Sequence, residues 1–289
     1  MKYDGLIRFI KLFQHYLYLI SLKTYKKFSV ILECSRATDN EKKEIGKLLM
    51  QGMPLRFFPY HFPDNYNEED IKVFRDEEKY PYVLHNNKKL YMKKKWSDRQ
   101  CKSYYNSIRI EQYNGSPHKY LKSESRFPKN DVVADIGAAE GIFGLEIIEI
   151  VKHLYLFEAE EDWLIPLRKT FSPWCNKVNI VRKYVSNKDH GNNITLDSFF
   201  KNKEISYIKA DIEGAEELML QGASETLSKV NRMLLCTYHR PNDEMLLKDI
   251  LQKKGYLIEF NEGYVLYIWD RKTFKAPYLR RCVMFAYKR

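Results

Sequence analysis

The sequence predicts an α/β fold: a mostly parallel, doubly wound sheet that ends in antiparallel C-terminal strands, preceded by an N-terminal helical and irregular extension. From Asp131 onward, short apolar segments alternate with stretches of helical periodicity, as in βαβ units. Two of these segments, VVADIGAAEGIFG from Val132 and YIKADIEGA from Tyr207, run into a carboxylate and then break into glycine. The last three apolar segments have no helical pattern between them, which indicates strands that are joined directly.

Each element of the α/β part follows from this alternation. Strands are expected at 132–136, 153–157, 178–181, 205–210, 233–237, 256–260, 264–269 and 283–287. Helices are expected at 141–151, at 162–170, from 215 onward and at 243–254.

Residues 1 to about 125 differ in composition: they are rich in aromatic residues and lysine, and their apolar residues follow no regular pattern. Proline at positions 54, 59 and 63 excludes an α-helix there, so the stretch is expected to be a long structured loop. We therefore divide the chain into an N-terminal extension, residues 1–125, for recognition or association, and an α/β domain, residues 126–289.

The first twenty residues predict an amphipathic basic helix rather than a membrane span. Arg8, Lys11 and His15 interrupt the apolar residues, so no run approaches the ~18 apolar residues that a span requires. Such a helix either packs against its own domain or touches a membrane surface. Its apolar positions are Leu6, Ile7, Phe9, Ile10, Leu12, Phe13, Leu17 and Ile20.

The composition indicates the partners and the cellular compartment of the protein more than the reaction that it catalyses. Its 289 residues carry a formal net charge of +11, which favours acidic partners such as nucleic acid, anionic lipid surfaces or acidic glycans. The five cysteines lie far apart, without a CxxC pair or metal-ligand spacing. We therefore expect reduced thiols in a cytoplasmic protein, with peripheral contact to the inner face of the membrane as an option.

The first glycine break does not fit a dinucleotide fingerprint, because the third and sixth positions of its turn hold alanine and isoleucine. It fits Asp135-x-Gly137-x-x-x-Gly141, the loop of class I methyltransferases that bind S-adenosyl-L-methionine (SAM). Asp135 and Glu140 would repel a pyrophosphate but suit a cofactor with a sulfonium and an ammonium group. The alternative is a turn whose glycines only permit tight packing.

Glu158 ends the next strand, where a carboxylate can accept both hydroxyls of an adenosine ribose. Nicotinamide enzymes share this position, so it supports an adenosine cofactor without naming it. The failed fingerprint argues against a nicotinamide oxidoreductase. A plain surface glutamate is the alternative. Ala138 and Ser186 are further candidate cofactor contacts.

The second break places Asp211 and Glu213 two residues apart at a strand end, where both can point to one side. The next strand ends near His239, which therefore lies beside them if the two strands are neighbours. The three residues could orient an acceptor hydroxyl, with His239 as the base, or hold a divalent metal that acidifies it. We predict no metal ligands, although a metal is compatible with the site. Otherwise Asp211 caps a helix and His239 is a hydrogen-bonded loop residue.

Three segments together resemble the FkbM-type methyltransferases: DIGAAEGIFG from Asp135, FEAE from Phe157, and IKADIEGAEELMLQGA from Ile208. The resemblance extends from Glu111 to the C-terminus, and the D-x-E-G-A-E run is its most specific part. It implies a Rossmann-like class I SAM-dependent O-methyltransferase, acting on sugar hydroxyls in polysaccharide, glycolipid or natural-product biosynthesis. By position it implies a cofactor loop at Asp135, Gly137 and Gly141, a ribose ligand at Glu158, and an acidic site at Asp211 and Glu213.

The stretch EQYNGSPHKY, from Glu111 to Tyr120, precedes the first strand, where such folds often close over the methionine end of SAM. His118 and Tyr120 are the candidate contacts there, with a solvated linker as the alternative. The long N-terminal region departs from the family pattern.

Two other functions compete with this prediction. The sequence lacks both an Asn/Asp-Pro-Pro-aromatic motif and a catalytic Pro-Cys pair, which argues against nucleobase methylation. RNA ribose methylation stays open, as does a non-catalytic binding module on a SAM fold. The expected partners are SAM and a carbohydrate-type acceptor. The sequence specifies neither the acceptor hydroxyl nor the oligomeric state.

Overall fold

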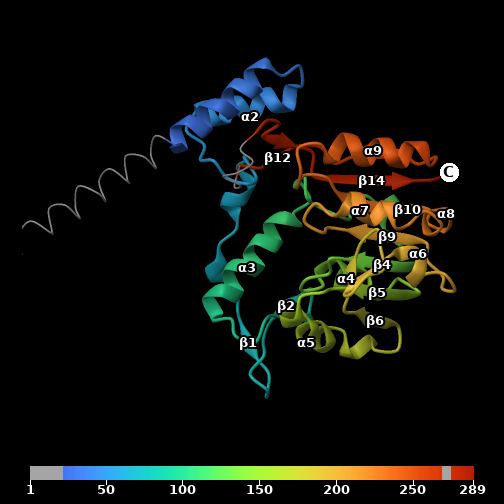
Figure 1. Cartoon of the computed structure of the whole chain (residues 1–289). Helices are drawn as coiled ribbons and strands as arrows, with labels where there is room; N and C mark the ends of the chain where they lie inside the picture. Colours follow the sequence, from blue (N-terminus) through green and yellow to red (C-terminus); the bar gives the residue numbers. More distant parts are fainter. Residues whose placement is uncertain (1–21, 269–274) are drawn as a thin grey trace, which may run out of the picture. The chain divides into compact units, whose positions relative to one another are not determined.

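The computed structural model describes residues 22–268 and 275–289 (Figure 1). The chain forms two compact units, Met1–Tyr60 with Tyr264–Arg280, and His61–Gly263 with Arg281–Arg289. This division differs from the predicted boundary at residue 125, because a late segment of the chain leaves the α/β unit and packs with the early one. Within the described ranges, no helix combines the length and apolar character of a membrane span.

The smaller unit holds a helix at residues 22–36, α2 (Asn40–Met50) and a two-stranded sheet of β12 (Val265–Leu266) and β13 (Leu279–Arg280). Val30, Cys34, Ile45, Leu49 and Leu266 are among its buried core residues. The strand expected at 264–269 is therefore present only as β12 and lies outside the main sheet. The amphipathic helix expected over residues 6–20 falls outside the described residues.

The larger unit is built on a seven-stranded sheet of the predicted class, with the strand order β11-β14-β10-β9-β4-β5-β6. Only β14 among these strands runs antiparallel to its neighbours, β10 and β11. The chain crosses from β4 to β5 and β6 on one side and then returns to β9 and β10 on the other. The topological switch point, where ligands bind in open α/β sheets, lies between β4 and β9. The strands are β4 (Val132–Ile136), β5 (His153–Phe157), β6 (Val178–Val181), β9 (Tyr207–Ala210), β10 (Arg232–Cys236), β11 (Leu257–Phe260) and β14 (Val283–Tyr287).

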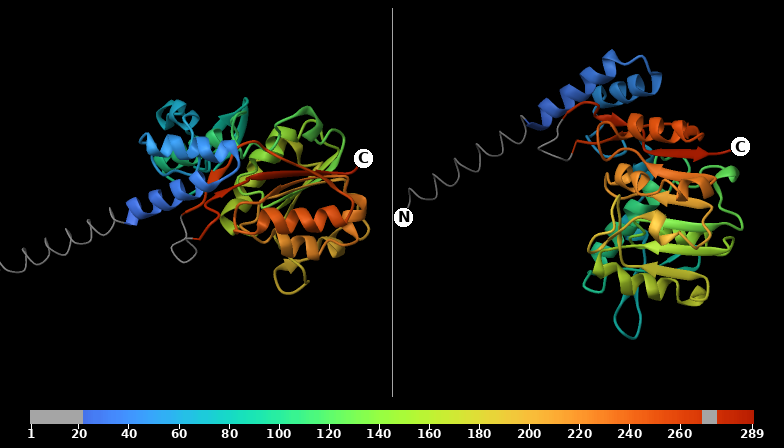
Figure 2. Two further views of the ribbon diagram at one scale, coloured as in Figure 1. Left: turned by 90° about the horizontal axis from the view of Figure 1, so that it is seen from above. Right: turned by 45° about the vertical axis from the view of Figure 1, so that its right-hand side comes forward.

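Alternate residues of the central strands face opposite sides of the sheet. Ala134, Ile136 and Ile208 belong to a buried cluster with Leu220 and Leu247 of the helices on that side. Figure 2 shows α7 and α9, in orange, together against the sheet. The helices of this cluster are α6 (Leu196–Phe199), α7 (Glu216–Gln221), α8 (Thr226–Lys229) and α9 (Asp243–Lys253).

The remaining elements of the larger unit include a small sheet of three antiparallel strands and α3, which begins with a capping box at Ser97. The proline-rich stretch contains only a short 3₁₀ turn, in agreement with the exclusion of an α-helix there. These elements are η1 (Phe62–Asn65), η2 (Glu68–Asp70), β1 (Phe74–Arg75), β2 (Pro81–His85), β3 (Lys88–Tyr91), α3 (Asp98–Glu111), η3 (Glu124–Arg126), α4 (Ile142–Ile147), α5 (Glu161–Thr170), η4 (Ser172–Trp174), β7 (Tyr184–Val185) and β8 (Asn193–Ile194).

A buried ion pair joins the two central strands. Asp135 and Lys209 are directly opposite each other in β4 and β9, and Lys209 Nζ lies 2.9 Å from Asp135 Oδ1. The same ammonium donates a hydrogen bond to the carbonyl of Gly137, at 3.0 Å. Asp135 is fully buried and Lys209 is 3% exposed. Each charge depends on the other, because an unpaired charge at this depth is strongly unfavourable.

We expect Lys209→Met to lower the free energy of unfolding by about 3–5 kcal/mol, because it leaves the Asp135 carboxylate buried without a counter-charge. The double variant Asp135→Asn/Lys209→Met should regain most of this loss, since neither charge remains. Urea unfolding followed by circular dichroism measures both effects. Equal losses in the single and double variants would show that the pair is not energetically coupled.

Candidate active site

The two acidic glycine breaks lie side by side at the carboxyl edge of the sheet. Gly137 has φ +74°, and a Cβ at this position would lie 2.0 Å from the carbonyl oxygen of Asp211. The Asp211 N–H in turn donates a hydrogen bond to the carbonyl of Ile136, at 3.1 Å. Glycine is therefore required at position 137 by both conformation and space.

Hydrogen bonds and close packing also fix the remainder of the first loop, residues 138–141. The Ala138 N–H donates to the carbonyl of Phe157, at 3.1 Å. Glu140 is 4% exposed and accepts a 2.6 Å hydrogen bond from the hydroxyl of Tyr104 in α3. Gly141 has φ +89°, and a Cβ there would lie 2.7 Å from the Phe171 ring. The loop is thus preformed, with fixed backbone positions around the switch point.

Asp135 does not face a cationic cofactor as predicted from the sequence. Its charge is neutralised within the protein by Lys209. Asp135 therefore acts on the loop by holding Lys209, which binds the carbonyl of Gly137. Glu140 keeps its predicted place in the loop, and its hydrogen bond from Tyr104 stabilises a carboxylate.

Glu158 lies at the end of β5, beside the loop. Its Oε2 accepts a hydrogen bond from the Ala139 N–H at 2.9 Å, and its Oε1 accepts one from the Glu160 N–H at 2.6 Å. Partial burial raises the pKa of this carboxyl. Each carboxylate oxygen has a second lone pair, so the side chain can still accept the two hydroxyls of a ribose.

Around His239 the second break forms a carboxylate cluster. His239 Nε2 lies 3.3 Å from Asp211 Oδ1 and 3.8 Å from Glu213 Oε2. On the other side of the ring, Nδ1 lies 3.4 Å from Glu216 Oε1. His239 is 8% exposed and Glu216 is fully buried. The structure thus brings together Asp211, Glu213 and His239, the three predicted catalytic residues.

Glu216 is the residue that the sequence analysis missed. It lies in the first turn of α7 and also accepts a 2.9 Å hydrogen bond from the Ile212 N–H, which fixes its carboxylate. Burial by itself lowers the pKa of His239, but the carboxylates of Glu216 and Asp211 outweigh burial and raise it above the ordinary value. The signal for Glu216 was present in the D-x-E-G-A-E run, whose last glutamate is this residue.

On the opposite side of Asp211 lie the two residues predicted from the stretch before β4. The Tyr120 hydroxyl donates a 2.8 Å hydrogen bond to Asp211 Oδ2, and His118 Nε2 lies 3.6 Å from the same oxygen. Burial by itself raises the pKa of Asp211, but His118, His239 and Lys209 together hold it well below its ordinary range. Asp211 is therefore ionised, with a basic side chain on each flank.

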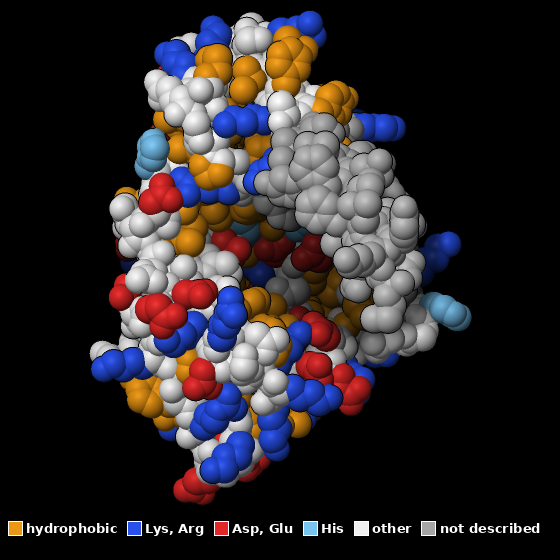
Figure 3. Space-filling view, turned by 90° about the vertical axis from the view of Figure 1, so that its left-hand side faces the viewer, with side chains coloured by type: hydrophobic (Ala, Val, Ile, Leu, Met, Phe, Trp, Pro, Cys, Tyr) orange, Lys and Arg blue, Asp and Glu red, His pale blue; other side chains and the backbone are white. Residues whose placement is uncertain are grey.

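A further carboxyl belongs to this region. Burial raises the pKa of Glu111, at the end of α3, to about 7; His118 opposes this rise, while Asp211 and Glu140 add to it. Figure 3 shows acidic side chains near the middle of the face that it presents. Among the residues that the structure describes, two groups of ligand atoms lie close enough to hold a metal ion, and both include Asp211: with His118 and Cys236, or with Glu216 and His239.

Ser186 lies apart from these contacts, beside the end of α7. The Ser186 N–H donates a hydrogen bond to the carbonyl of Ile194, at 2.9 Å. A Cβ on Gly222 would lie 2.2 Å from the carbonyl oxygen of Ser186. These contacts give Ser186 a structural role, and its assignment as a cofactor contact stays a prediction.

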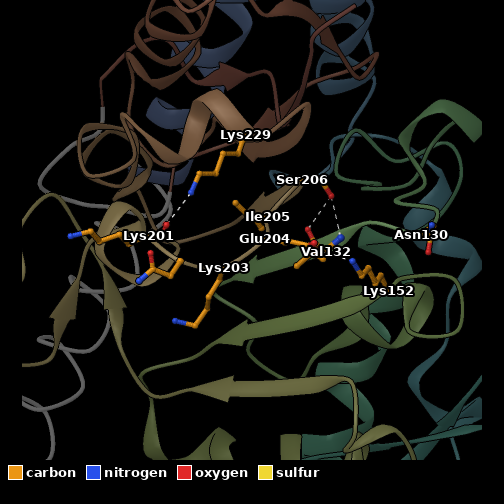
Figure 4. Close-up of a pocket in the computed structure, with 10 residues that line it drawn as sticks. Asn130, Val132, Lys152, Lys201, Lys203, Glu204, Ile205, Ser206 and Lys229 are labelled. Carbon is orange, nitrogen blue, oxygen red and sulfur yellow. Dashed lines mark hydrogen bonds and ion pairs between the residues drawn. The ribbon is translucent and has the colours of Figure 1, made fainter.

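Another hollow, of about 540 Å³, opens at the amino edge of the sheet (Figure 4). Lys152, Lys201, Lys203 and Lys229 line it, but three of these ammonium groups bind partners of the protein: Lys152 binds Glu204, while Lys203 and Lys229 bind backbone carbonyls. It lies at the edge opposite the acidic breaks, so it takes no part in the candidate site.

Comparison with known proteins finds one family model and several solved structures that are similar to this chain. Residues 183–265 match the model of the methyltransferase FkbM domain family. A crystal structure of methyltransferase FkbM from Methylobacillus flagellatus is 16% identical, with a TM-score of 0.47 over 93% of this chain and 60% of that one. This chain therefore spans less than two thirds of that protein. No curated protein matches the chain.

Two further solved structures are similar over slightly more than half of this chain. An rRNA methylase from Streptococcus thermophilus is 15% identical, with a TM-score of 0.39 over 56% of this chain and 90% of that one. A Streptococcus mutans protein in complex with SAH is 13% identical, with a TM-score of 0.37 over the same shares of 56% and 90%.

Gly137→Ala should weaken SAM binding by at least about tenfold and lower the melting temperature. Its Cβ collides with the Asp211 carbonyl, and the loop must move to relieve the clash. Gly191→Ala is the matched control, since Gly191 also has positive φ, at +56°, but a Cβ there meets nothing within 4 Å. Calorimetry with SAM and thermal unfolding measure the two effects. Equal SAM affinity in both variants would contradict the assignment of this loop to the cofactor.

Proposed function

We propose that this chain, an FkbM-type SAM-dependent methyltransferase, transfers the methyl group of SAM to a hydroxyl oxygen of a sugar or glycan. The family match supplies the class of reaction and the cofactor. The acceptor is inferred from the chemistry of the cluster around His239.

The observation that carries the proposal is the pair of carboxylates that hold the two nitrogens of His239. In O-methylation, the C–S bond of SAM breaks with its electron pair on sulfur, the acceptor oxygen bonds to the methyl carbon, and the hydroxyl proton must leave. His239 Nε2 is the group that receives this proton. Glu216 fixes the orientation of the ring and stabilises the imidazolium that forms, in the manner of a carboxylate behind a general base.

The acidity of the site favours a neutral sugar hydroxyl over an RNA ribose. Asp211, Glu213 and Glu216 surround His239, and carboxylates are good acceptors for the hydroxyl groups of a sugar. The same carboxylates would repel the phosphates that flank a ribose in RNA. The RNA alternative draws on the net charge of +11 and on similarity to an rRNA methylase, and neither concerns the site itself.

A methyl-transfer screen tests the class of acceptor. The protein would be incubated with methyl-labelled SAM and with nucleotide sugars, glycolipids, polysaccharides, tRNA or rRNA. We expect label in a carbohydrate acceptor, with His239→Ala lowering turnover by roughly 10²–10⁴-fold while SAM affinity stays unchanged. Label in RNA alone, or undiminished turnover in His239→Ala, would overturn the proposal.

The pH profile separates a positioning role of Glu216 from a structural one. His239 must be neutral to take a proton, so activity should rise with pH as His239 deprotonates, above the ordinary pKa of histidine. Glu216→Gln removes a charge that raises this pKa, so the acid limb of kcat/KM should move to lower pH. Glu217→Gln, the next residue of α7, is the control and should leave the limb in place. If Glu216→Gln lowers kcat/KM at every pH without moving the acid limb, Glu216 does not act through the pKa of His239 and the positioning role is contradicted.

A further inference from the structure

Two residues of the candidate site, His118 and Tyr120, lie on a segment without regular secondary structure. Residues 112–123 follow α3, precede η3 and belong to no helix or strand of the described structure. Both side chains are nevertheless buried, and both reach the same carboxylate oxygen of Asp211. Groups outside the segment must therefore hold its backbone if these side chains are to keep one position.

One buried side chain, that of Asn261, holds this segment on both sides of His118. Its Nδ2 donates hydrogen bonds to the carbonyls of Pro117 and Lys119, each at 2.8 Å. Its Oδ1 accepts a hydrogen bond from the guanidinium group of Arg126, which fixes the orientation of the amide. Asn261 is 2% exposed. Both donors of the amide are thus directed at the two carbonyls that border His118.

The sheet in turn holds Asn261. This residue directly follows β11, and its N–H donates a hydrogen bond to the carbonyl of Val283 in β14, at 3.1 Å. Because β10 and β11 both run antiparallel to β14, they share one direction, and β11 ends at the carboxyl edge of the sheet. Asp211 lies at the same edge, after β9. The amide therefore ties the segment to the edge at which the candidate site is built.

We propose that Asn261 is a positioning residue of the methyl-transfer site, which keeps His118 and Tyr120 in place. Through them it acts on Asp211, the neighbour of the proposed base His239, so this role rests on the proposed function. Without the amide, both carbonyls lose a buried donor, and the segment must move to replace it. Moving a group of an active site by about 1 Å can lower the rate by about 10²-fold.

The titration of His118 reports its position without any methyl transfer. Glu111 of α3, Asp211 after β9 and His239 after β10 act on its imidazole. The two carboxylates raise its pKa above the ordinary value, against the effects of burial and of His239. We expect Asn261→Ala to bring this pKa down toward the ordinary value, because the imidazole moves away from Asp211. A pH titration of the imidazole resonances of the full-length protein, by nuclear magnetic resonance, measures the change.

Turnover in the methyl-transfer assay is the second measure. Asn261→Ala should lower kcat by roughly 10–100-fold. Asn261→Asp keeps an acceptor for Arg126 but has no N–H to donate, so it should lower kcat likewise and serves if the alanine variant does not fold. In a His118→Asn background, both changes should lower kcat clearly less, because part of their effect passes through His118. A general loss of stability would not depend on this background.

Tyr256→Phe is the matched control, because Tyr256 makes a similar clamp at the other end of β11. Tyr256 is also 2% exposed, and its hydroxyl binds the carbonyls of Leu227 and Val230, at 2.9 and 2.6 Å. It precedes β11 and therefore lies at the amino edge of the sheet, away from the candidate site. Its replacement should lower the melting temperature and leave both kcat and the pKa of His118 as they are.

Three results would overturn the proposal. One is a folded Asn261→Ala variant in which the pKa of His118 is unchanged. Another is a loss of turnover that adds in full to the loss caused by His118→Asn, and the third is an equal loss of turnover in Tyr256→Phe. If the unaltered protein methylates no acceptor, the proposed function fails instead, and the titration of His118 still decides whether Asn261 holds it.

Discussion

The buried pair of Asp135 and Lys209 is the constraint on which the site depends. It places one positive charge between the two glycine breaks, in register across β4 and β9. Asp211 follows Lys209 by two residues and therefore lies on the same side of the sheet edge. The two basic residues His118 and His239 then lie beside Asp211, and Glu216 lies beyond His239. Negative and positive groups thus alternate from the cofactor loop to the proposed base.

This alternation explains how so many ionisable groups are buried at the edge of one sheet. Removing charges from water costs several kcal/mol for each ion unless an opposite charge compensates. In the array from Asp135 to Glu216, every member has an opposite neighbour, and the pKa directions of Asp211, Lys209 and His239 reflect it. A proton delivered to His239 therefore enters a site already arranged for a positive charge there, with little reorganisation.

The sequence predicted the α/β class and the adjacency of the two breaks, because strand ends and glycine turns are local signals. It also placed His239 beside Asp211, since both residues follow predicted strands. His118 and Tyr120 were predicted as contacts to SAM, and their position beside Asp211 comes from the structure. Lys209 and Glu216 were missed for a common reason. Lys209 lies within an otherwise apolar strand, and Glu216 lies in the first turn of a helix. Charged residues at such positions are usually exposed to solvent or interact with the helix dipole, so neither residue stands out in the sequence. The division of the chain was also missed, because the packing of residues 264–280 with the first helices is a long-range contact without a local pattern.

Charge is separated in this protein between the site and the rest of the surface. The net charge of +11 belongs to a chain whose candidate catalytic cluster is acidic, so the excess of lysine and arginine lies outside the cluster. The acidic cluster suits a cationic cofactor and a neutral hydroxyl. The basic surface suits an anionic molecule or surface that carries the acceptor or lies next to it. Under this arrangement, added salt weakens the encounter with an anionic surface through screening, while the buried charges of the site are screened far less. Salt dependence of binding and salt independence of the methyl-transfer step are therefore expected to appear together in the same enzyme.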